Sequence, residues 1–253
     1  MYYHFSNLFY HIETKSGTGI FPLDLITGSV LASTIPLIIG ILVSSKIKGK
    51  NLFIGFIIGA LFFLFFDLLK QTSGISEARI NNIIEVANYL GFMIGISVFF
   101  PLIFSKEVKT NLYIVYVWAL LGVGFHSFGE GSIIAYDFLT GETVITLTQV
   151  ISYSLHKFAE GLAIGILLYE TSKEIRDVVI SFLLSSTPFI VGLISSLYYP
   201  TSELSTIFFS IAAGSTVFLL SYLLTRNKIN DKLLLGIMIG LSFIFFAGVL
   251  HSI

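Results

Sequence analysis

Two hexapeptides place histidine and glutamate side chains within otherwise apolar sequence. HSFGEG begins at His126 and HKFAEG begins at His156, and in each the glutamate follows the histidine by four residues. Residues with this spacing lie on one face of a helix, about one turn apart. If two neighbouring helices present them, the side chains of His126, Glu130, His156 and Glu160 can surround one point.

Two imidazoles and two carboxylates form a nitrogen and oxygen ligand set that suits Zn, Fe or Mn and suits Cu(I) poorly. The chain has no cysteine, so a thiolate metal site is excluded. A single His/Glu pair can also be a structural hydrogen bond between packed helices. The repetition of the pair favours a site for a metal ion or a path for protons over that structural interpretation.

The elements that position these residues are expected to be membrane helices. Of the 253 residues, 55% are hydrophobic and only 11% are charged, and about 20 apolar residues are enough to cross a bilayer. We therefore predict an all-α integral membrane protein. Residues 1–253 are expected to form one transmembrane domain, which includes a short outer N-terminal segment, 1–19. The eight predicted spans are 22–45, 52–69, 83–104, 112–137, 143–169, 178–198, 204–224 and 233–251.

The basic residues predict how the helices are oriented, because Lys and Arg accumulate in cytoplasmic loops. The loops after the first, third, fifth and seventh spans carry ten of the 14 basic residues, whereas the other side carries Lys15, Lys70 and Arg79. Both termini are therefore expected outside the cytoplasm. The ten residues are Lys46, Lys48, Lys50, Lys106, Lys109, Lys173, Arg176, Arg226, Lys228 and Lys232.

The fourth and fifth spans, joined by the short segment DFLTGE from Asp137, are expected to form a tight antiparallel hairpin. Both hexapeptides then fall near the bilayer midplane, where an ionisable group costs roughly 2.5–3.5 kcal/mol. Such groups need compensating partners, and a dication would neutralise both glutamates.

Further polar residues extend each hexapeptide along its helix face. Gln149 and Ser152 precede His156, and Asp137 follows Glu130 at helical spacing, so we predict a path from an outer mouth to the four ligands. Gly131 and Gly161, directly after the two glutamates, predict close helix packing around the site. His4 and His11, in the outer segment, are weaker candidates for collecting metal.

These motifs resemble the paired metal-binding motifs of the ZIP (Zrt/Irt-like) family of divalent metal transporters. SSTPFIVGLIS from Ser185 and SIAAGSTVFLLSYLL from Ser210 are similar to two other segments of that family. The resemblance implies eight spans and a homodimer that imports zinc, iron or manganese. It also implies that His126, Glu130, His156 and Glu160 are the central metal ligands.

The chain also departs from the family pattern. Ser127 and Gly129 stand where many relatives have Asn and Pro, and Lys157 stands where some relatives have an acidic residue of a second metal site. A protonated lysine cannot bind a metal, so we predict one transport site, with Lys157 paired to Glu130 or Glu160. Asp67, near the outer end of the second span, is either an outer ligand or an ordinary helix-end carboxylate.

We therefore expect a transporter of the plasma membrane rather than an enzyme, with zinc as the first candidate cargo, iron or manganese as the others, and no catalytic cofactor. The net charge of −1 gives no reason to expect nucleic acid binding. Two alternatives remain open. One is an intramembrane hydrolase that uses the same cluster to hold a catalytic metal, and the other is a proton-coupled solute carrier that uses it as a proton relay.

Overall fold

The computed structural model describes residues 22–44, 51–74, 82–97, 112–140, 147–171, 174–199 and 202–251, and they contain helices and no strand. The all-α prediction is confirmed for these residues. The helices are α2 (Pro22–Ser44), α3 (Asn51–Gly74), α4 (Asn82–Ser97), α7 (Leu112–Thr140), α8 (Leu147–Thr171), α9 (Ile175–Tyr198), α10 (Ser202–Arg226) and α11 (Asp231–His251).

Each predicted span overlaps one of these helices, although residues 98–104 of the third span and 143–146 of the fifth lie outside the described residues. Six of the eight helices are long and apolar enough to cross a membrane. The apolar part of α4 is shorter, and α8 has a sufficient length but carries more polar side chains. Large apolar side chains such as Phe66, Met238 and Phe245 are more than half exposed on the outside of the bundle. Such surfaces are stable against lipid tails rather than against water.

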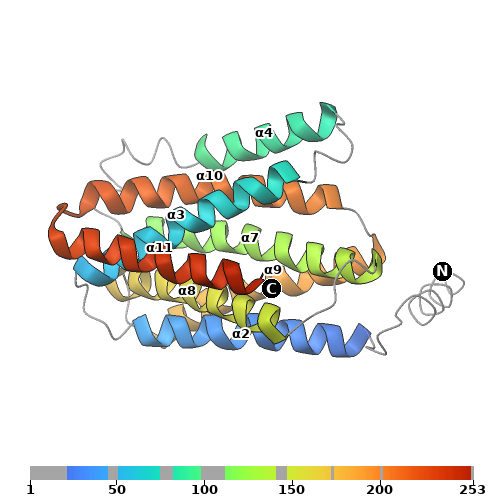
Figure 1. The fold of residues 1–253 in the computed structure, drawn as a ribbon, viewed down its shortest axis with the longest axis horizontal. Helices are drawn as coiled ribbons and strands as arrows, with labels where there is room; N and C mark the ends of the chain where they lie inside the picture. Colours follow the sequence, from blue (N-terminus) through green and yellow to red (C-terminus); the bar gives the residue numbers. More distant parts are fainter. Residues whose placement is uncertain are drawn as a thin grey trace, which may run out of the picture.

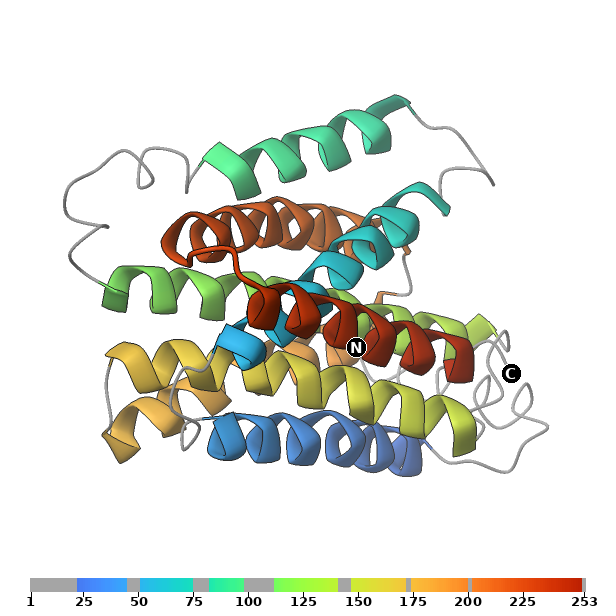
Figure 2. The ribbon, with the colours of Figure 1, turned by 60° about the vertical axis from the view of Figure 1, so that its left-hand side comes forward.

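The helices lie side by side in a bundle, with α4 at one edge and α2 at the opposite edge (Figures 1 and 2). The most extensive contacts join α7 to α9, α3 to α11, α2 to α8 and α4 to α10. The helices α7 and α8, which carry the two hexapeptides, are thus each fixed by a different partner. This arrangement places the hexapeptides in the interior of the bundle.

Glycines allow the closest of these contacts. A Cβ atom at Gly131 of α7 would collide with the backbone carbonyl oxygen of Phe189 on α9, and one at Gly161 of α8 would collide with that of Leu37 on α2. Both glycines directly follow a glutamate of the hexapeptides. The predicted packing role of Gly131 and Gly161 is confirmed. Each glutamate therefore lies next to a close contact between two helices, α7 with α9 or α8 with α2.

The fourth and fifth spans contact each other, but the predicted turn DFLTGE begins too early, because residues 137–140 belong to α7. The helix α7 continues through Asp137 to Thr140, and α8 begins only at Leu147, with 141–146 outside the described residues. The two helices contact each other less extensively than α7 contacts α9 or α8 contacts α2. The physical reason is that small residues bring α7 to α9 and α8 to α2, whereas bulky polar side chains fill the space between α7 and α8.

Candidate metal centre

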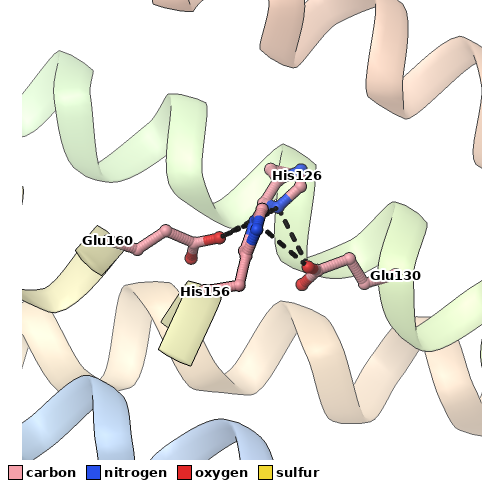
Figure 3. A group of neighbouring side chains, drawn as sticks. All are labelled: His126, Glu130, His156 and Glu160. Atoms are coloured by element: carbon pink, nitrogen blue, oxygen red, sulfur yellow. Dashed lines mark hydrogen bonds and ion pairs between the residues drawn. The ribbon is translucent and has the colours of Figure 1, made fainter. Parts of the chain in front are cut away.

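The helices α7 and α8 each present one histidine and one glutamate, a turn apart, to the same point in the bundle. His126 lies near the middle of α7 and His156 lies in the middle part of α8. Only 2% of His126, 7% of Glu130 and 3% of Glu160 is exposed, and His156 is partly buried. Figure 3 shows the four side chains pointing toward one another from the two helices.

The four side chains are close enough to bind one ion. One ligand atom from each lies within 4.8 Å of the others. The two Nε2 atoms are 3.2 Å apart. The Oε1 atom of Glu160 lies 2.9 Å from Nε2 of His126 and 3.1 Å from Nε2 of His156. The Oε1 atom of Glu130 lies 3.0 Å and 3.8 Å from the same two nitrogens. The sequence prediction that these residues converge is confirmed, and their binding of a metal stays a prediction.

Lys157 contacts both carboxylates of the cluster. Its side chain is fully buried, and its Nζ atom pairs with Oε2 of Glu130 and, at 2.8 Å, with Oε2 of Glu160. The ammonium also donates to the hydroxyl of Ser127 at 3.2 Å. The predicted pairing of Lys157 with Glu130 or Glu160 therefore occurs with both. With neutral imidazoles, two carboxylates and one ammonium leave a formal charge of −1.

Each carboxylate contacts both a histidine nitrogen and the ammonium of Lys157. In Glu130, Oε1 faces the histidine nitrogens and Oε2 faces the ammonium of Lys157. In Glu160, Oε1 faces the histidine nitrogens and also accepts from the ammonium at 3.1 Å, while Oε2 accepts from it at 2.8 Å. Two histidine nitrogens and two carboxylate oxygens therefore converge on one point. This donor set fits a divalent first-row ion such as Zn²⁺, Fe²⁺ or Mn²⁺.

A small pocket reaches the cluster from the side of α3 and α11. It touches His156 and Glu160 and is otherwise lined by apolar side chains of Ala60, Leu61, Leu64, Ala159 and Ile244. The ring of Phe209 on α10 packs against the imidazole of His126 with 5.8 Å between the ring centroids. The pocket leaves the His156 side of the cluster the more accessible one.

The other predicted pathway residues do not join the cluster. Ser152 donates a hydrogen bond of 2.6 Å to the carbonyl oxygen of Ala247 on α11, and Asp67 accepts one of 2.8 Å from Gln71 on its own helix. Asp137 lies in the last turn of α7. The side chain of Gln149 and the residues His4 and His11 lie outside the described residues. A continuous outer path stays a prediction.

Sequence reasoning missed a tyrosine that donates a hydrogen bond to the cluster. The hydroxyl of Tyr153 on α8 donates a hydrogen bond of 3.2 Å to Oε2 of Glu130. An aromatic residue in an apolar helix normally indicates core packing, which is why the pattern did not single it out. Its position three residues before His156 and four before Lys157 was the available signal, because this spacing puts all three on neighbouring parts of one helix face.

Comparison with known proteins does not assign the chain to a family. No protein-family model matches the chain, and a search of curated proteins also found no match. Fold and site together define a class: a helical protein of membrane type with a buried His/Glu cluster that could bind a metal ion.

Proposed function

We propose that the protein is a divalent metal transporter that binds one cation between α7 and α8 and carries it into the cytoplasm. The observation that carries this proposal is the convergence of His126, Glu130, His156 and Glu160 within 4.8 Å, inside a bundle in which six helices could cross a membrane. Ionisable groups at that depth are costly and are retained mainly for function. A transported dication explains why two histidines and two glutamates share one point.

The proposal includes the topology and family inferred from the sequence. Eight spans with both termini outside place the cluster near the bilayer midplane, and the resemblance to the ZIP family supports import by a plasma-membrane homodimer. Zinc is the first candidate cargo, because a compact site with two imidazoles and two carboxylates suits it. Iron and manganese accept the same donor set, and their selection depends on geometry and availability.

Transport would use the cluster as a replacement for the hydration shell of the ion. The ion loses water to the two histidine nitrogens and the two Oε1 atoms and is released when the helices rearrange. Binding has to be strong enough to select the ion and weak enough to release it. Lys157 contributes to release, because its ammonium attracts the same carboxylates that hold the ion.

The test is uptake of Zn²⁺, Fe²⁺ and Mn²⁺ into proteoliposomes, each alone and in competition. We expect uptake by the wild type and its loss in Glu160→Gln, which keeps the shape of the side chain but removes its charge. Glu203→Gln, on the exposed first turn of α10, is the matched control and should transport normally. If the wild type neither binds nor moves any of the three ions, the proposal fails.

One observation favours a second candidate, a proton-coupled solute carrier. The ammonium of Lys157 already pairs with both glutamates, so the cluster is largely compensated without a metal and can act as a proton relay. This candidate predicts that Zn²⁺ does not raise the unfolding temperature of the purified protein. Stabilisation by Zn²⁺ in the wild type, absent in Glu160→Gln, would exclude it in favour of the metal transporter.

A further inference from the structure

Tyr153 lies beside the cluster and contacts side chains on α7, α8 and α9. It lies on α8, and its partly buried ring packs against Phe189 of α9, with 6.1 Å between the ring centroids. The Nζ atom of Lys157 lies 5.7 Å from the centroid of the same ring. Its hydroxyl reaches across to α7 and donates to Oε2 of Glu130. Tyr153 therefore connects α9, Lys157 and one of the four ligand side chains.

The contact falls on the oxygen of Glu130 that does not face the histidines. Oε1 lies 3.0 Å from Nε2 of His126, whereas Oε2 receives the hydroxyl of Tyr153 and the ammonium of Lys157. A carboxylate with one oxygen held on two sides cannot rotate freely about its terminal bond. The other oxygen is then fixed toward the point on which the ligands converge.

The two glutamates are not held in the same way. Both oxygens of Glu160 accept from Lys157, at 3.1 Å and 2.8 Å, and Glu160 lies on the same helix as that lysine, three residues away. Glu130 comes from the other helix, so its orientation depends on contacts across the α7–α8 interface. Tyr153 provides one of these contacts from a ring that is itself packed in place.

We infer that Tyr153 is a positioning residue for the metal site, which orients the carboxylate of Glu130 so that Oε1 binds the dication. This inference rests on the proposed function. The hydroxyl acts on the ion through Glu130 and does not bind it directly, because the oxygen of Glu130 that it contacts is the one directed away from the histidines. Groups that orient a metal ligand by hydrogen bonding typically change metal affinity by about 10- to 100-fold when they are removed.

The test compares the whole chain with Tyr153→Phe, which deletes only the hydroxyl and keeps the ring packing with Phe189. Tyr116→Phe is the matched control. It removes another buried hydroxyl of the same bundle, one that donates to the backbone carbonyl of Asp177 at 2.9 Å and lies ten residues, about 15 Å along the helix, from His126. Co²⁺ is the probe, because its visible absorption spectrum reports the ligands and geometry of the bound ion, and Zn²⁺ competition gives the affinity.

We expect Tyr153→Phe to weaken Zn²⁺ binding by about tenfold or more and to change the Co²⁺ spectrum, while Tyr116→Phe changes neither. In a Glu130→Gln background the effect of Tyr153→Phe should shrink, because the two changes act on one ligand. Unchanged affinity and spectrum in Tyr153→Phe would overturn the inference and leave the transporter proposal standing. Equal losses in both tyrosine variants would also overturn it, because the cause would then be general packing. Failure of the wild type to bind either ion would instead overturn the proposed function and this inference with it.

Discussion

Replacing Lys157 with methionine should change the stability of the metal-free protein and its affinity for a dication in opposite directions. Methionine is similar in length and apolar, so it fills the buried space of the lysine chain without its charge. In the metal-free protein the ammonium pairs with both buried glutamates. Removing one partner of a buried ion pair costs about 3–5 kcal/mol, which lowers the unfolding temperature of a chain of this size by on the order of 10 °C.

The affinity should rise because the ammonium repels the ion. The Nζ atom of Lys157 lies 3.1 Å from Oε1 of Glu160, the oxygen that faces both histidines. A zinc–oxygen bond adds about 2 Å, so the ammonium and the ion are at most about 5 Å apart. At an effective dielectric constant of about 20, charges of +1 and +2 at that separation repel by about 7 kcal/mol. Even if relaxation cancels most of this energy, the remaining gain exceeds about 1.4 kcal/mol, which is tenfold in affinity.

Thermal unfolding with and without Zn²⁺ measures both effects. The chain has a single tryptophan, Trp118 on α7, whose fluorescence can follow unfolding in detergent. A ligand raises the unfolding temperature more when its affinity is higher, so the shift caused by Zn²⁺ should be larger in Lys157→Met than in the wild type. Lys232→Met, on the exposed first turn of α11, is the control for loss of a positive charge. If Lys157→Met is as stable as the wild type without metal, or if Zn²⁺ shifts both proteins equally, Lys157 is not electrostatically coupled to the metal site.

Two further predictions follow from packing and from ligand chemistry. Gly131→Val should lower the unfolding temperature, because its side chain would meet the backbone of Phe189 and overpacking costs about 1–3 kcal/mol. Gly28→Ala, which has open space around it, should not lower it, and equal stability of the two variants would contradict the α7–α9 contact. Zn²⁺ affinity should fall as the pH is lowered from about 8 to about 5, because ligand histidines must be neutral and ligand glutamates ionised. Equilibrium dialysis across that range measures it, and a constant affinity would contradict ligation by His126 and His156.

The four cluster residues could be predicted from the sequence because their spacing fixes which helix face they share. Residues four apart in the sequence lie about one turn apart on the same face of a helix. His126 therefore had to pair with Glu130, and His156 with Glu160. Lys157 was also predictable, because an ammonium beside two carboxylates in an apolar interior has few other partners. Helix positions followed from the apolar runs.

The pairing of helices could not be predicted in the same way. Helices that are apolar on every side have no stripe that identifies a partner. The short connection predicted contact between the fourth and fifth spans, but nothing in the sequence named the more extensive partners of each. The actual partners of α7 and α8 are set by close backbone contacts at Gly131 and Gly161. Tyr153 escaped prediction for a related reason. Its ring packs like a core residue, and only the three-dimensional arrangement shows that its hydroxyl meets Glu130.

The charge of the cluster explains why a transport site would contain its own lysine. Two glutamates alone would carry −2 when empty and 0 with a dication, so the empty site would be costly in the bundle and the loaded site would hold its ion too firmly. With Lys157 paired to both, the same site carries −1 when empty and +1 when loaded. Neither state then leaves more than one uncompensated charge in an apolar interior, where charge is expensive. The empty and loaded sites are thereby closer in electrostatic cost, which is the condition for a carrier that has to bind its ion and also let it go.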